Sequence, residues 1–103
     1  MKYNKLVRDR IPEIIERSGR RAFCRKLSDA EYIVELERKL DEAVAEFHLR
    51  KNIEELVDIM AIIEALSKVY GGGAWELQNF HRQKMLSQGG FDLKIFLEEV
   101  NNK

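Results

Sequence analysis

Two neighbouring segments, KLDEAVAEF and IEELVD, carry acidic residues beside an apolar helical face. The acids near that face are Glu42 and Glu46 in the first segment, and Glu54, Glu55 and Asp58 in the second. Carboxylates that converge repel one another unless a cation lies among them, and their hard oxygen atoms suit Mg²⁺ or Mn²⁺. The pattern therefore predicts either a metal site or, as the simpler alternative, a solvated acidic face.

The angular positions of these acids bear on whether they can meet. At about 100° per residue, positions 43 and 55 both lie about 50° from the centre of their apolar face. Positions 46 and 58 both lie about 110° from it, in the same sense. In antiparallel helices, equal offsets of one sense can meet in the groove between the helices. Periodicity alone leaves open whether the side chains meet there or diverge.

Capping signals predict the bounds of the helices that carry these acids. Ser28 begins an S-x-x-E capping box, which predicts a helix over about 29–50. Asn52 is the expected N-cap of a second helix over about 53–70, which ends at a run of glycines. Asn52 and Glu55 also fit an N-cap and its N3 partner, a role that needs no metal.

Both helices have an apolar face that must be buried. The face of the first helix is expected to centre on Leu36, Leu40, Val44 and Phe47. The face of the second is expected to centre on Leu56, Ile59, Ile63, Leu66 and Tyr70. The second face is wide, which favours a position at the centre of a bundle or in a subunit interface. We therefore predict an antiparallel pair of helices in a bundle that is completed by a homodimer.

Shorter elements flank this pair. Pro12 fits the first position of a short helix that stops at Gly19. Residues 20–27 are expected to be irregular or extended. A third long helix is predicted over about 75–88, and residues 91–100 form a short tail with apolar side chains available for docking.

Length and composition indicate a single all-α domain over residues 1–103, with 45% hydrophobic and 35% charged residues. The formal net charge is zero, so no overall field would attract nucleic acid or an anionic membrane. No apolar run approaches the roughly 20 residues that cross a bilayer, and the N-terminal sequence lacks the apolar region of a secretion signal. The single cysteine, Cys24, excludes an internal disulfide and fits a cytoplasmic location.

Four stretches of the chain carry a family resemblance, and they occur in order over nearly its whole length: YNKLVRDRIPEII, KLDEAVAEF, EELVDI and HRQKMLSQGGF. In these stretches the chain resembles the MazG-like, phosphoribosyl-ATP pyrophosphatase-like branch of the all-α NTP pyrophosphatases. The resemblance implies a helical bundle of that type and a Mg²⁺-dependent pyrophosphohydrolase. Such an enzyme would cleave a nucleoside triphosphate, or a phosphoribosyl-ATP-like substrate, to monophosphate and pyrophosphate.

The family's motif is Glu-x-x-Glu on one helix and Glu-x-x-Asp on the next. The resemblance implies Glu46, Glu55 and Asp58 as Mg²⁺ ligands, while Ala43 replaces the first Glu of the motif. Glu42 is adjacent but lies about 100° further round the helix. Glu42 and Glu46 are the candidate catalytic residues, because either carboxylate could orient or deprotonate the attacking water.

A triphosphate also needs cations to neutralise its charge. Lys5, Arg8 and Lys84 are the candidates to bind the substrate phosphates, and a solvated surface charge is the alternative for each. Ala43 supports a second hypothesis about function. In that hypothesis the chain is a catalytically impaired homologue that acts as a nucleotide-binding or interaction module.

Overall fold

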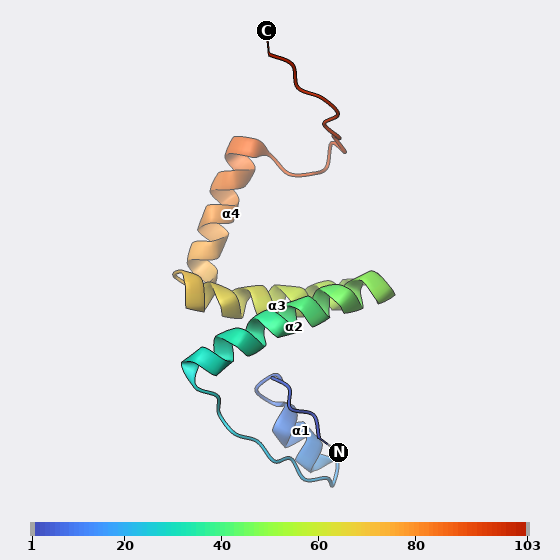
Figure 1. Ribbon diagram of the computed structural model, residues 1–103, viewed down its shortest axis with the longest axis vertical. Helices are drawn as coiled ribbons and strands as arrows, with labels where there is room; N and C mark the ends of the chain where they lie inside the picture. Colours follow the sequence, from blue (N-terminus) through green and yellow to red (C-terminus); the bar gives the residue numbers. More distant parts are fainter. Residues whose placement is uncertain (1, 103) are drawn as a thin grey trace.

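Residues 2–102 are described by a computed structural model, and within them the chain forms four helices and no strand (Figure 1). The helices are α1 (Ile11–Arg17), α2 (Asp29–Arg50), α3 (Ile53–Tyr70) and α4 (Ala74–Gln88). The predicted all-α class is thus confirmed for this part of the chain. The predicted ranges of α2 and α3 match the observed ones, and α4 begins one residue earlier than predicted.

The start of α2 is fixed by the capping box that the sequence predicts. The backbone N–H of Glu31 donates to Oγ of Ser28 at 3.2 Å, and the backbone N–H of Ser28 donates to Oε1 of Glu31 at 3.0 Å. Arg25, in the preceding irregular segment, donates from Nη2 to Oε2 of Glu31 at 2.9 Å. One carboxylate therefore ties the helix start to the segment before it.

This cluster predicts a pH effect. Hydrogen bonds from Arg25, and then from Ser28, lower the pKa of Glu31 from 4.5 to about 2. Because the folded-state pKa is depressed, the stabilisation is present above the ordinary pKa and is lost as pH falls from 4.5 to about 2. In an NMR titration, the side-chain carboxyl carbon of Glu31 should have a midpoint near 2. Arg25→Gln should raise that midpoint more than Ser28→Ala, and a wild-type midpoint at the ordinary value would contradict the prediction.

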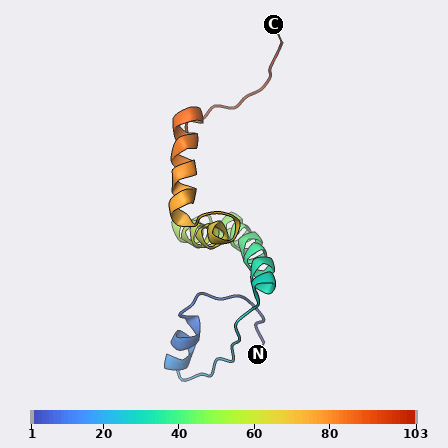
Figure 2. The ribbon, with the colours of Figure 1, turned by 90° about the vertical axis from the view of Figure 1, so that its left-hand side faces the viewer.

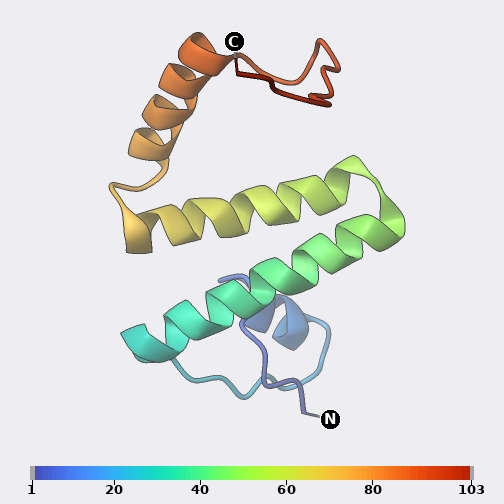
Figure 3. The same ribbon diagram turned by 45° about the horizontal axis from the view of Figure 1, so that its top comes forward.

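A two-residue connection turns α2 back onto α3. Lys51 adopts a left-handed conformation, with φ 51° and ψ 47°, and its N–H donates to the carbonyl oxygen of Phe47. Asn52 then caps α3, because its Oδ1 accepts from the N–H of Glu55 at 3.1 Å. The two helices consequently form an antiparallel hairpin, as predicted (Figure 3).

The predicted apolar faces match the observed burial only in part: Leu36, predicted at the centre of the first face, is buried. Leu36 and Ala43 are buried on α2, and Glu55 is buried on α3. Val44 and Tyr70, predicted near the centres of the faces, are exposed instead. The apolar faces are wider than the contact, and a single facing helix covers only one edge of each. The burial of positions 43 and 55 agrees with their predicted offsets.

The rest of the chain is open. The radius of gyration is 18.5 Å, whereas a compact chain of this length has about 13 Å. Figures 1 and 2 show α4 standing away from the hairpin, with the C-terminal tail extending beyond it. Across residues 2–102, Leu36 and Ala43 are the only buried apolar residues. One chain by itself therefore does not enclose a full hydrophobic core.

No helix in residues 2–102 is both long enough and apolar enough to cross a bilayer.

Candidate functional site

The acids predicted to bind metal lie near the turn of the α2–α3 hairpin. Glu46 is in the last turns of α2, whereas Glu55 and Asp58 are in the first two turns of α3. The two-residue connection brings the end of α2 beside the start of α3. Glu55 is the buried acid of the three, and Glu46 and Asp58 are exposed, as their larger angular offset predicts.

Arg50 links two of these acids. Its Nε lies 3.3 Å from Oε2 of Glu46, and its Nη1 lies 3.6 Å from Oε1 of Glu55. One guanidinium group therefore pairs with a carboxylate on each helix. Arg50 is not among the site residues predicted from the sequence. Two features of the sequence could have indicated it: the i,i+4 spacing of Arg50 from Glu46, and its place in the last helical turn, where a positive charge is favourable.

Asp58 has a different basic partner, which comes from the N-terminal segment. Nη2 of Arg8 donates to Oδ1 of Asp58 at 2.7 Å, across a separation of 50 residues. Lys5, in the same segment, lies 3.9 Å from Glu42. The segment predicted to bind phosphate is thus placed on the two helices predicted to bind metal.

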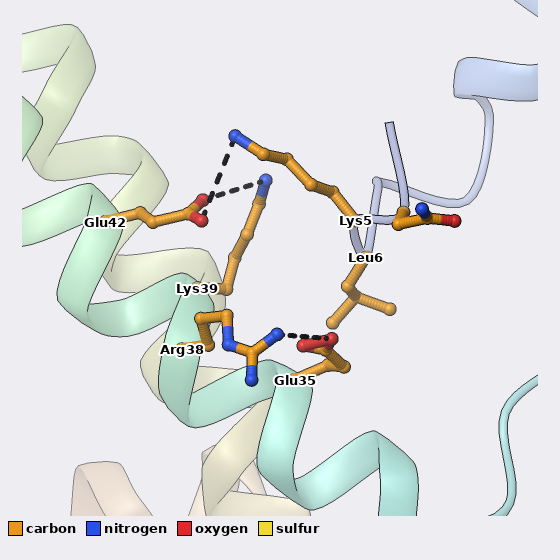
Figure 4. Close-up of a pocket in the computed structure, with 7 residues that line it drawn as sticks. Lys5, Leu6, Glu35, Arg38, Lys39 and Glu42 are labelled. Atoms are coloured by element: carbon orange, nitrogen blue, oxygen red, sulfur yellow. Dashed lines mark hydrogen bonds and ion pairs between the residues drawn. The ribbon is translucent and has the colours of Figure 1, made fainter. Parts of the chain in front are cut away.

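Glu42 points toward lysines. Its carboxylate lies 3.9 Å from Nζ of Lys5 and 3.8 Å from Nζ of Lys39 (Figure 4). Beside it is a cavity of about 10 Å³, also lined by Leu6 and Glu35. A space of that size holds about one water molecule and no nucleotide. Glu42 could orient a water there, but it does not share the basic partner of Glu46 and Glu55.

Lys84 is not brought to this region within one chain. It is carried by α4, which in residues 2–102 packs against α3 and against no other helix. Figures 1 and 2 show α4 on the opposite side of the hairpin from the N-terminal segment. The predicted role of Lys84 in binding phosphate stays a prediction.

The side chains as placed do not yet form a metal centre. Over residues 2–102, no group of three or more His, Cys, Asp or Glu side chains is gathered closely enough to hold an ion. Glu46 and Glu55 converge on one guanidinium group, while Asp58 is turned toward Arg8. The donor set still suits Mg²⁺, because this ion takes oxygen ligands and needs few protein carboxylates beside its waters.

A larger cavity lies elsewhere, at the start of α2. It measures about 360 Å³, which is within the range of small-molecule sites. Its lining combines apolar and charged side chains: Arg25, Leu27, Ala30, Glu31, Val34 and Glu35. None of these is a predicted site residue, so this cavity is separate from the acids of the hairpin.

Comparisons with known proteins found one partial relative. The chain is 62% identical over 42 residues to an uncharacterized protein of Mycolicibacterium smegmatis. The match covers 41% of this chain and 43% of the relative, so it spans less than half of either protein. No family model and no solved structure matches the chain.

Proposed function

We propose that the chain is a Mg²⁺-dependent nucleotide pyrophosphohydrolase of the MazG-like, all-α NTP pyrophosphatase type. The observation that carries the proposal is the contact between Arg8 and Asp58. It places a basic segment suited to a triphosphate against the acidic residues suited to a divalent cation. The substrate would be a nucleoside triphosphate or a phosphoribosyl-ATP-like compound, and the products would be a monophosphate and pyrophosphate.

In this proposal Glu46, Glu55 and Asp58 hold Mg²⁺, which neutralises charge on the substrate phosphates when bound. Once Asp58 is used in this way, Arg8 is free to donate to phosphate oxygens, for which its planar guanidinium is well suited. Lys5, which lies 3.9 Å from Glu42 on α2, would supply a second positive charge. Glu42 would orient a water molecule or accept its proton, because in this proposal it is the candidate carboxylate that does not bind the metal.

A second candidate function is a nucleotide-binding module without catalysis. Ala43 stands where the family has a metal ligand, and it is only 8% exposed in the contact between α2 and α3. The site is thus short of one oxygen donor at a position that solvent does not reach. A chain of this kind would bind a non-hydrolysable triphosphate analogue and release no pyrophosphate from the natural nucleotide.

The experiment that tests the proposed function is pyrophosphate release from nucleoside triphosphates, with Mg²⁺ and with a chelator. We expect release with Mg²⁺, because the carboxylates cannot offset the charge of a triphosphate without a cation. Binding of the analogue without release would favour the second candidate.

We also propose that the protein is a homodimer in which α3 is covered by the second copy. The described chain exposes 9855 Å², whereas a compact monomer of 12.1 kDa exposes about 6,000 Å². Part of the exposed apolar surface lies on α3, at Ile53, Leu56, Val57, Met60, Ile63 and Tyr70. Burying such a face is the main driving force for stable association.

Analytical ultracentrifugation tests the dimer. At micromolar concentration the sedimenting species should have twice the mass of the 12.1 kDa chain. Met60→Glu, which places a charge on the exposed face, should shift the protein toward the monomer because a charge buried in an interface is costly. A monomeric mass for the wild-type chain at that concentration would contradict the proposal.

A further inference from the structure

Arg50 occupies the place between two predicted metal ligands. Its guanidinium group lies within 4 Å of Glu46 on α2 and of Glu55 on α3. We infer that Arg50 is a tethered counter-ion that competes with the divalent cation for these two carboxylates. The inference rests on the proposed function, since it concerns the same site.

The burial of Glu55 explains why a counter-ion is needed. The Glu55 side chain is only 12% exposed, and a carboxylate taken out of water requires a positive partner. Glu46 adds a second negative charge on the same side of the hairpin. Arg50 provides the positive charge from within the chain and stabilises the hairpin when no metal is bound.

The ion pairs of Arg50 with Glu46 and Glu55 can separate by a movement of the Arg50 side chain alone. The Arg50 side chain is 61% exposed and is long and flexible, so it can turn into solvent without leaving an unsatisfied buried group. It would remain in the last turn of α2, where the helix dipole favours a positive charge. A divalent cation can therefore replace it, but the cost of separating the ion pairs weakens the apparent metal affinity.

The test is calorimetric titration of MgCl₂ into Arg50→Gln without nucleotide, with Arg38→Gln as the matched control. Arg38 is also on α2, its side chain is 63% exposed, and it pairs with Glu35 on the same helix. Removing the competitor should lower the Kd for Mg²⁺ about three- to tenfold in Arg50→Gln, as expected for the loss of two partly exposed ion pairs. Arg38→Gln should bind Mg²⁺ like the wild-type chain.

Three results would overturn the inference or separate it from the proposed function. Equal Kd values for wild type and Arg50→Gln would show that Arg50 is only a structural link between the helices, and would leave the proposed function standing. No Mg²⁺ binding by either protein would refute both. If circular dichroism shows that Arg50→Gln has lost helix, the titration is done with Arg50→Lys in its place. A lysine cannot bridge both carboxylates, so the Kd of Arg50→Lys for Mg²⁺ should also be lower than that of the wild type. An unchanged Kd would overturn the inference.

Discussion

Replacing Glu55 with glutamine is expected to lower Mg²⁺-dependent pyrophosphate release by at least about 100-fold. Residues that only support a metal ligand cost up to about 100-fold when they are replaced, and the loss of a ligand itself should cost at least as much. The substitution keeps the size of the side chain and removes the charge. The N-cap contact at the start of α3 uses the backbone N–H of Glu55, so the helix should still form. The loss would therefore come from the missing carboxylate and not from a broken fold.

The matched control for this variant is Glu54→Gln. Glu54 is the preceding residue of α3 and is exposed, so its replacement changes the net charge by the same amount without touching the proposed site. The values of kcat/KM for both variants and the wild type make the comparison. If Glu55→Gln and Glu54→Gln lose activity equally, Glu55 has no specific role at the metal.

The second large effect is expected from Ala43→Glu. Position 43 is buried on α2, and Glu55 is buried on α3. A carboxylate at position 43 would restore the fourth acid of the family motif. We expect the Kd for Mg²⁺ to fall about tenfold or more, which corresponds to about 1.4 kcal/mol or more of added binding free energy.

The same substitution should destabilise the metal-free protein. Ala43 is buried, so a glutamate there is partly removed from water and is placed near the existing acids. The free energy of unfolding should drop by about 2 kcal/mol without metal and recover with Mg²⁺. Ala43→Gln is the control, since it has the same size and no charge. Equal Mg²⁺ affinities for the two variants would rule out a ligand position at residue 43.

The helices could be predicted from the sequence because their ends are set by local contacts. Ser28 and Glu31 satisfy each other within one turn, and Asn52 caps α3 in the same way. These contacts depend on residues three positions apart, which a sequence pattern shows directly. The antiparallel arrangement followed from the short connection between the two helices.

The rotation of the helices could not be predicted with the same accuracy. Hydrophobic periodicity placed Val44 near the centre of its face, whereas Ala43 is the residue buried against α3. A wide apolar face leaves the direction of the contact open, because several rotations bury similar apolar area. Which part of such a face is covered depends on the neighbouring element and not on the helix itself.

The partners of the site acids depend on contacts between distant segments. The ion pair of Arg8 with Asp58 joins residues 50 positions apart, and no periodic pattern indicates it. Arg50 could have been noticed from its spacing to Glu46, but its second contact, with Glu55, depends on the hairpin turn. The acids could therefore be picked out from the sequence pattern. The cations that pair with them could be picked out only in part.

We propose that the hairpin acids and the N-terminal basic segment form a site that hydrolyses a nucleoside triphosphate with a divalent metal. The decisive measurement is of both products from a panel of ribonucleoside and deoxyribonucleoside triphosphates, with MgCl₂ and with EDTA. At least one nucleotide should yield monophosphate and pyrophosphate in equal amounts, and only with Mg²⁺. Release of inorganic phosphate in place of pyrophosphate, undiminished release in EDTA, or no release from any member of the panel would contradict it.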